Sequence, residues 1–159
     1  MRNLYPLLSV LLLIYWSCLD PLNKYYLNNE ETEPSVNLWG VDYSIKNTTE
    51  LKFPPTLTSI GLTGPIPPEI GNLTNLEWLV LGSNELTESI PSEIGNLTNL
   101  IILYLNNNQL TGDIPESICD LYIDWSSSLY FRIYNNQLCP PYPSCIEDYV
   151  GIQDTTNCD

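Results

Sequence analysis

The chain has 159 residues, which is enough for one domain with a continuous hydrophobic core. Its 19 acidic and 5 basic residues give a formal net charge of −14, so no basic stripe is present to replace the counterions of nucleic-acid phosphates. This composition excludes nucleic-acid binding and predicts repulsion from bare anionic membrane surfaces. The acidity alone is typical of a well-solvated secreted surface.

Residues 1–17 have the pattern of an export signal. Arg2 supplies the positive charge, and the apolar run from Leu7 to Trp16 that follows is too short to span a bilayer comfortably. The run ends at Ser17-Cys18, and a small residue directly before a cysteine resembles the signal of bacterial lipoproteins, in which Cys18 would be acylated. The two bulky aromatic residues before Ser17 depart from that signal. Ordinary cleavage nearby and an uncleaved anchor are the alternatives.

Residues 18–37 are predicted to form a flexible tether, because the stretch from Asn28 to Pro34 is polar and has little to bury. Residues 38–49, LWGVDYSIKNTT, bring back aromatic and aliphatic side chains, and the folded part is expected to begin there as an N-terminal cap. The side chains expected to cover the open apolar end of the fold are Trp39, Val41, Tyr43 and Ile45.

Residues 73–96 and 97–120 are two copies of one 24-residue unit, LTNLEWLVLGSNELTESIPSEIGN and LTNLIILYLNNNQLTGDIPESICD. Nine positions of the first copy recur at this fixed offset: Leu73, Leu76, Leu79, Leu81, Asn84, Leu86, Ile90, Pro91 and Ile94. A period of this length is typical of a solenoid, in which no single repeat can bury its own apolar face.

Each unit predicts one turn of a coil. The alternation around Leu79 and Leu81 predicts a short strand with one buried face, and strands of successive units are expected to pair into a parallel sheet. Pro91 bars regular helix and predicts a return arm that is extended or 3₁₀. An asparagine follows each strand, and these amides are expected to form an internal ladder that bonds buried backbone groups: Asn84, Asn108 and Asn136.

Degenerate repeats are predicted on both sides of the regular pair, at residues 50–72 and 121–138. In the first, Pro54 and Pro55 fall where strand residues belong at the 24-residue spacing, which suits an edge strand. The last is four residues longer than the unit. Its insertion is expected within Tyr122 to Ser128, ahead of a strand at Leu129 to Tyr134.

Four of the five cysteines lie toward the C-terminus: Cys119, Cys139, Cys145 and Cys158. In an exported chain they predict a cap over residues 139–159 held by two disulfides, with three pairings open. Zinc is the competing interpretation, but the chain has no histidine and no C-x-x-C pair. A calcium loop of the D-x-D-x-D-G type is also absent, so neither a metal nor another cofactor is predicted.

The pattern LxxLxxLxLxxNxLTGxIPxxIGN closely resembles the plant-type class of leucine-rich repeat. The resemblance implies a curved right-handed solenoid with a parallel sheet on its concave side and a binding role, usually towards protein or peptide. Trp39-Gly40-Val41 likewise resembles the core of the plant N-terminal cap, although the paired cysteines of that cap are absent. The expected fold class is therefore α/β, mostly strands with 3₁₀ and irregular segments, in two regular repeats, two degenerate repeats and two caps.

No catalytic site is predicted. The chain has no histidine, so the commonest general base is absent, and it has no G-x-S-x-G elbow for a serine nucleophile. The adjacent carboxylates Glu30-Glu31 and Glu147-Asp148 lie in the predicted tether and tail, where nothing holds a carboxylate pair across a cleft.

The candidate binding residues alternate with the buried leucines and should therefore face solvent on the concave side. They are Trp78, Val80, Ile102, Tyr104, Asn106, Tyr130, Arg132 and Tyr134, joined by Thr56 and Thr58 if the first strand is in register. Clustered Trp, Tyr and Arg are residue types that anchor interfaces, and Arg132 is a candidate contact for a partner carboxylate. The alternative is that these are simply residues that favour strands on a short sheet.

We therefore predict a monomeric, non-catalytic module that binds protein or peptide, with carbohydrate as a further candidate ligand. Its expected place is the cell surface or outer membrane, where it would act in binding or adhesion, attached through an N-terminal lipid anchor or signal. Two alternatives stay open. One is a secreted receptor-like or inhibitor-like fragment without the lipid, and the other is a structural envelope protein without a specific ligand.

Overall fold

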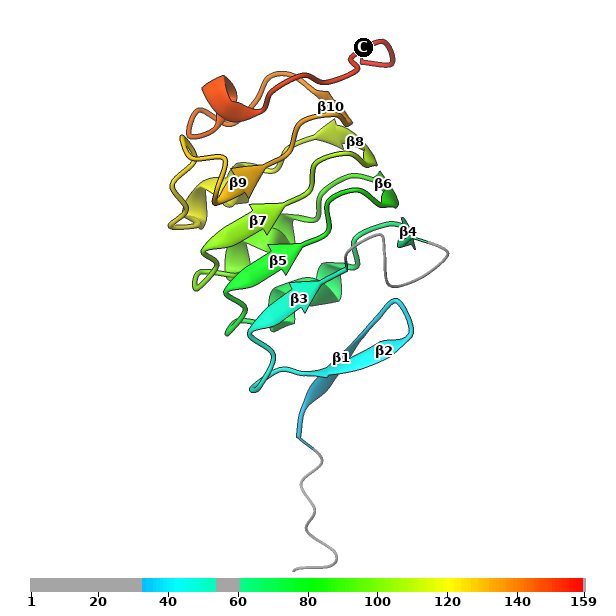
Figure 1. Ribbon diagram of the computed structural model, residues 1–159, viewed down its shortest axis with the longest axis vertical. Coiled ribbons are helices and arrows are strands. Elements are labelled where there is room, and N and C mark those ends of the chain that lie inside the picture. The colour runs from blue at the N-terminus through cyan, green and yellow to red at the C-terminus, as the bar shows by residue number, and fades with distance from the viewer. Residues whose placement is uncertain (1–32, 54–60, 159) are drawn as a thin grey trace, which may run out of the picture. The chain divides into compact units, whose positions relative to one another are not determined.

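The computed structural model of the protein describes residues 33–53 and 61–158, which form a short solenoid of stacked coils (Figure 1). The predicted signal at residues 1–17, Cys18 and the first part of the predicted tether lie outside the described residues, as do Thr56 and Thr58. In the described part of the chain, no helix has both the length and the apolar character that crossing a membrane requires.

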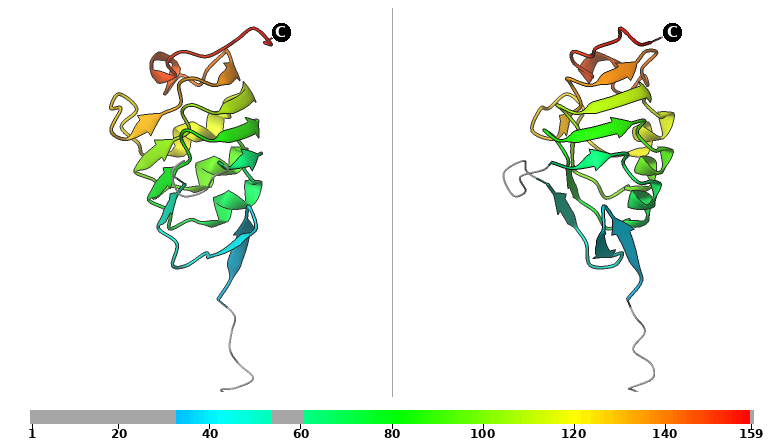
Figure 2. Two further views of the ribbon diagram at one scale, coloured as in Figure 1. Left: turned by 45° about the vertical axis from the view of Figure 1, so that its right-hand side comes forward. Right: turned by 90° about the vertical axis from the view of Figure 1, so that its right-hand side faces the viewer.

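Two parallel four-stranded sheets run along the stack, because each coil contributes one short strand to each sheet (Figures 1 and 2). The first sheet has the order β3-β5-β7-β9 and consists of β3 (Glu50–Lys52), β5 (Trp78–Val80), β7 (Ile102–Tyr104) and β9 (Phe131–Arg132). The second has the order β10-β8-β6-β4 and consists of β4 (Thr63–Gly64), β6 (Glu85–Glu88), β8 (Gln109–Asp113) and β10 (Gln137–Cys139). The first is the parallel sheet that the sequence predicts. The second was not predicted.

Each of the first three coils returns through a short 3₁₀ helix, which confirms the arm that the prolines predict. The three arms are η1 (Pro68–Asn72), η2 (Ser92–Asn96) and η3 (Glu116–Asp120). A proline stands directly before each of η2 and η3, with φ near the value that a proline ring imposes. The arms pack closely, since a Cβ added at Gly95 would lie 2.5 Å from the carbonyl oxygen of Ser117.

The hydrophobic core is a continuous column inside the coils. The repeated leucines of the first sheet, such as Leu79 and Leu103, are fully buried and stack directly on one another through the strand register. Burying each such side chain stabilises the fold by about 1.5–3 kcal/mol relative to leaving it exposed. No coil could gain this alone, so the stack is the folding unit.

Asparagine side chains join successive coils where the strands of the first sheet end. The Asn108 amide nitrogen donates to the carbonyl oxygens of Leu81 and Leu105, each at 3.0 Å. Its side-chain oxygen accepts the N–H of Leu86 at 3.1 Å. Asn84 and Asn136 repeat this arrangement one coil earlier and one coil later. Each amide thus satisfies backbone groups of its own coil and of the preceding one.

The N-terminal cap is an antiparallel hairpin of β1 (Ser35–Leu38) and β2 (Val41–Ser44). It begins at Ser35, inside the stretch predicted as tether, so that boundary was wrong. The hairpin was missed because its first strand is short and lies beside a polar run.

Three of the four residues expected to cover the open end do so, and Val41 does not. Val36 and Leu38 of β1 are buried, whereas Val41 is 49% exposed. The reason is that β1 packs against η1 and β2 is the outer strand. Trp39, Tyr43 and Ile45 are half-buried against the core.

The first strand also differs from the prediction. Leu51 of β3 pairs with Leu79, so the strand ends at Lys52, before Pro54 and Pro55. This coil is four residues longer than the regular unit, as is the fourth, in which Phe131 pairs with Leu103. A proline has no N–H to donate to a neighbouring strand. The strand therefore lies upstream of the two prolines, and the 24-residue spacing fails here.

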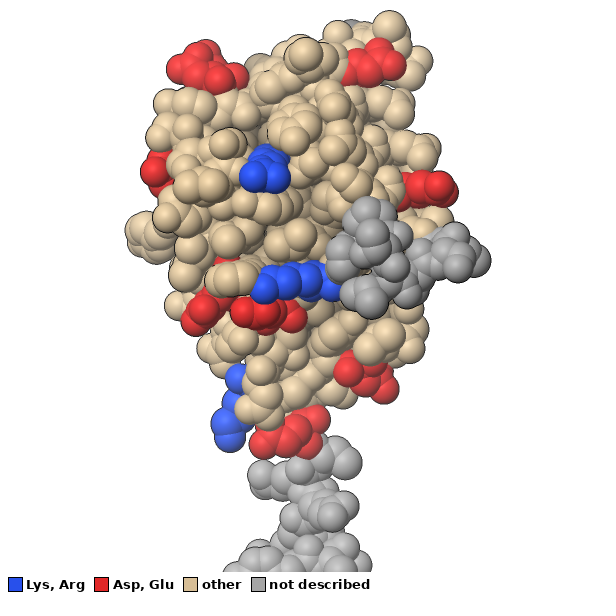
Figure 3. Space-filling model, viewed as in Figure 1, with Lys and Arg blue, Asp and Glu red and all other residues tan. Residues whose placement is uncertain are grey.

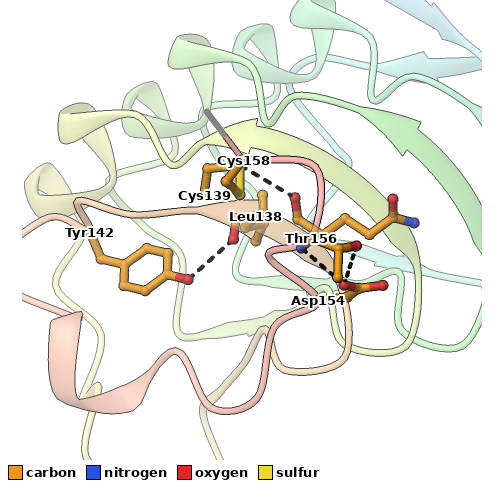
Figure 4. Close-up of a disulfide and its surroundings, with 7 residues drawn as sticks. Leu138, Cys139, Tyr142, Asp154, Thr156 and Cys158 are labelled. Carbon is orange, nitrogen blue, oxygen red and sulfur yellow. Dashed lines mark hydrogen bonds between the residues drawn. A yellow bond between two sulfur atoms is a disulfide. The ribbon is translucent and has the colours of Figure 1, made fainter.

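The C-terminal cap is held by the disulfides Cys119–Cys145 and Cys139–Cys158, so two disulfides form as predicted and the pairing is resolved. Figure 4 shows the second of them. After η4 (Glu147–Tyr149), the chain passes beside the last repeat, and Gln153 donates its amide to the carbonyl oxygens of Ile133 and Val150. Gln153 therefore continues the asparagine ladder by one further step.

Candidate binding surface

The outward side chains of the first sheet form two rows that cross its strands. The strand register sets Glu50 beside Trp78 and Trp78 beside Ile102, and Tyr130 continues this row just before β9. The second row consists of Lys52, Val80, Tyr104 and Arg132. Neighbouring strands lie about 4.8 Å apart, so adjacent members of a row can contact one ligand. We call these eight residues the binding face.

This face is mostly uncharged in a chain with a net charge of −14 (Figure 3). Its acidic member is Glu50, and its basic members are Lys52 and Arg132. The Lys52 ammonium lies 2.7 Å from a carboxylate oxygen of Glu50 and 3.6 Å from the ring centroid of Trp78. Lys52 is therefore already paired with an anion and an aromatic ring. Sequence reasoning missed this pair because it placed the first strand too late.

Arg132 is held differently. Its guanidinium carbon lies 4.3 Å from the ring centroid of Tyr104, and its Nε donates to the carbonyl oxygen of Ser128 at 2.7 Å. Within residues 33–53 and 61–158, Arg132 forms no ion pair with a carboxylate. It is thus an oriented, unneutralised cation on the surface of an acidic protein.

Apolar side chains extend the binding face at the start of its last two strands. Ile101 is 47% exposed, Leu129 is 66% exposed and Tyr130 is 38% exposed. Each of Ile101 and Leu129 stands two residues before a member of the pair Leu103 and Phe131, with which the ladder between β7 and β9 begins. We call Ile101, Leu129 and Tyr130 the apolar shelf. Sequence reasoning missed Ile101 and Leu129 because it considered only alternate strand positions.

Two candidate residues beyond the strand ends behave differently from the rest. Asn106 is only 7% exposed, so its assignment to the binding face was wrong. It lies over the preceding coil, where a Cβ added at Gly82 would come within 2.8 Å of its side-chain oxygen. Tyr134 is exposed but packs beside Gly151 of the C-terminal cap.

The titratable groups for which the structure shifts the pKa lie in the two caps. Burial raises the pKa of Tyr43 and of Tyr142. Hydrogen bonds from the hydroxyl and the N–H of Thr156 lower the pKa of Asp154 (Figure 4). In the described part of the chain, no group of three or more Cys, Asp or Glu side chains is arranged to hold a metal ion.

A hollow of about 730 Å³ lies along the ends of the 3₁₀ arms, away from the binding face. It is shallow and lined by small and polar side chains, among them Gly71, Asn72, Gly95 and Asn96. Its glycines are explained by the close approach of neighbouring arms, because a Cβ at Gly71 would come within 2.6 Å of the Glu93 carbonyl oxygen. None of the predicted binding residues lines it.

The two regular repeats are similar to repeats of known proteins. Residues 74–119 match the family model described as leucine-rich repeats (2 copies). The BIR2 ectodomain from Arabidopsis thaliana is 28% identical over 59% of this chain and 50% of that chain, with a TM-score of 0.53. The Arabidopsis receptor kinase HAESA, solved with the peptide hormone IDA and the co-receptor SERK1, is 31% identical over 58% of this chain and 15% of that chain, with a TM-score of 0.51. A search of the curated proteins finds no match.

Proposed function

Since this chain is a leucine-rich-repeat protein of the plant type, we propose that it is a non-catalytic module that binds a peptide or an exposed protein segment on its binding face. The observation that carries the proposal is the gathering of exposed aromatic and aliphatic side chains around an unpaired arginine in an acidic chain. HAESA, which was solved with a peptide hormone, offers a parallel on a related stack of coils.

The size of the face favours a short ligand. The four strands of the first sheet span roughly 14 Å from the first to the last, at about 4.8 Å between neighbours. An extended peptide of about four or five residues covers that distance. A typical protein–protein interface buries about 800 Å² on each partner, which exceeds what two short rows offer.

We propose that the chain works outside the cytoplasm, attached to the cell surface. Its two disulfides support an oxidising compartment. The expected export signal at residues 1–17, acylation at Cys18 and a tether up to Ser35 complete this proposal. The intact mass of the mature protein from a membrane fraction tests it: a chain that starts at a diacylglyceryl-modified Cys18 is expected, and a soluble unmodified chain would contradict it.

Binding on the first sheet is tested with a random peptide library displayed against the immobilised full chain. Peptides selected on the wild type should bind a Trp78→Ala, Tyr104→Ala double variant at least tenfold more weakly, because aromatic anchors dominate such interfaces. Tyr149→Ala is the matched control, since Tyr149 is an exposed aromatic residue in the C-terminal cap. Equal binding by all three proteins would refute the proposed surface and favour a structural role.

A further inference from the structure

We infer that the ligand of the binding face carries an arginine side chain, which displaces Lys52 from a cation site formed by Glu50 and Trp78. The inference rests on the proposed function and names one chemical group of its ligand. The observation that carries it is the position of the Lys52 ammonium, 2.7 Å from a carboxylate oxygen of Glu50 and 3.6 Å from the ring centroid of Trp78. Lys52 thus occupies the site as an internal competitor of the ligand.

Glu50 and Trp78 together supply what a cation needs at a protein surface. An aromatic face attracts a cation that lies within about 6 Å of the ring centroid, and a carboxylate accepts charge-assisted hydrogen bonds from it. The strand register sets the two residues side by side, because Glu50 pairs with Trp78 across β3 and β5. The backbone of two coils therefore positions the site, while the present occupant stands on a flexible four-carbon stem.

Lys52 is held only weakly in this site. The side chain of Lys52 is 38% exposed and that of Glu50 is 49% exposed. An exposed ion pair contributes little stability, because water screens the attraction and because a long side chain loses rotamer freedom when it is held in one position. The ammonium can therefore move into solvent, which leaves Glu50 and Trp78 to an incoming cation.

An arginine fits this site better than the lysine that occupies it. Its planar guanidinium can stack on the Trp78 ring, and its fork of N–H donors matches both oxygens of the Glu50 carboxylate. An ammonium is a compact point charge that is strongly hydrated, so it offers a less directional contact and loses more on leaving water. We therefore expect a ligand arginine to compete with Lys52 more effectively than a ligand lysine.

The surrounding charges also favour a cation at this end of the face. The protein carries a net charge of −14, and Glu77 adds an exposed carboxylate next to Trp78, where its backbone N–H donates to the Thr49 carbonyl oxygen at 2.8 Å. Arg132 on β9 lies three strand spacings from β3, roughly 14 Å at about 4.8 Å each. That separation exceeds the Debye length of about 8 Å at physiological salt, so Arg132 repels a cation bound beside β3 only weakly.

A random peptide library selected on the full chain tests the inference. We expect arginine to be enriched among the selected peptides. These peptides should bind Lys52→Gln about threefold to tenfold more tightly than the wild type, because removal of the internal competitor raises the fraction of open sites. Lys46→Gln is the matched control, since it removes the same charge from an exposed pair with Glu33 in the N-terminal cap, and it should change binding less than twofold.

Two further comparisons assign the contacts. Glu50→Gln should weaken the arginine peptides about tenfold, because it removes the carboxylate that the guanidinium binds. Glu85→Gln, the same change at an exposed position of the second sheet, is its matched control and should have less than a twofold effect. Lysine in place of the arginine of a selected peptide should bind more weakly, and glutamine more weakly still. Circular dichroism checks that each variant is folded.

The outcomes separate this inference from the proposed function. Peptides that depend on Trp78 and Tyr104 but show no enrichment of arginine overturn the inference and leave the proposed function standing. The same holds if Lys52→Gln binds no more tightly than Lys46→Gln, or if lysine replaces the peptide arginine without loss. Recovery of no peptide that depends on the binding face overturns both.

Discussion

The asparagine ladder offers the sharpest test of how the coils are held together. Asn108→Ala removes three hydrogen bonds of 3.0 to 3.1 Å, which join its side chain to the carbonyl oxygens of Leu81 and Leu105 and to the N–H of Leu86. At about 1 kcal/mol for each bond, the variant should lose about 3 kcal/mol of unfolding free energy. The loss is larger if the backbone groups that lose their partner are not hydrated. That is a large part of the roughly 5–15 kcal/mol that stabilises a typical domain.

Urea unfolding followed by tryptophan fluorescence measures this loss. With a slope of about 1–3 kcal/mol per molar urea, the midpoint should fall by about 1–3 M. Asn99→Ala is the matched control, because it removes the same amide in the same repeat from an exposed position with one bond to the Thr74 carbonyl oxygen. It should cost about 0.5 kcal/mol or less. Equal midpoints for the two variants would refute the reasoning that the ladder stabilises the stack.

Three further outcomes are expected. Gly95→Ala should cost about 1–3 kcal/mol in urea unfolding, because its Cβ would meet the Ser117 carbonyl oxygen at 2.5 Å, and an unchanged midpoint would show that the arms can separate at no cost. Replacing Cys119 and its partner by alanine should cost about 3 kcal/mol, since the disulfide closes a 26-residue separation, and unfolding unchanged from that of the oxidised wild type would contradict this. Asp154 has a lowered pKa, so its contribution to stability is present above the ordinary Asp pKa and is lost as the pH falls through the lowered value. Thr156→Val should bring that pKa back toward its ordinary value in an NMR titration, and an unchanged pKa would exclude the hydroxyl as the main cause.

The regular repeats could be predicted because each repeated position meets the same single structural requirement in every coil. A leucine such as Leu79 must be apolar since it is buried in every coil, and Asn84 must carry both a donor and an acceptor since backbone groups on two coils need them. A proline at the position of Pro91 excludes a regular helix through that part of the return arm. The period therefore predicted the first sheet, the 3₁₀ arms and the ladder positions without knowledge of any contact.

The ends of the stack could not be predicted in the same way, because there the neighbour on one side is missing. The 24-residue spacing put the first strand at Pro54 and beyond, whereas tertiary pairing with β5 selects Glu50–Lys52. In the hairpin, Val41 was misassigned to the core and Val36 and Leu38 were missed, since alternation cannot reveal which strand of a hairpin is the outer one. Asn106 was misassigned for a related reason: its side chain lies over Gly82 of the preceding coil, a contact that strand alternation does not reveal.

The two coils that depart from the period supply the charged residues of the binding face. Both longer coils flank the regular pair, and they supply Lys52 at one end of the face and Arg132 at the other. The regular coils, constrained by stacking, contribute the aromatic and aliphatic middle, such as Trp78 and Tyr104. Repetition therefore fixes the spacing of the rows. The fourth coil also carries the exposed Leu129, whose carbonyl oxygen accepts the hydroxyl of Tyr104 in the neighbouring coil.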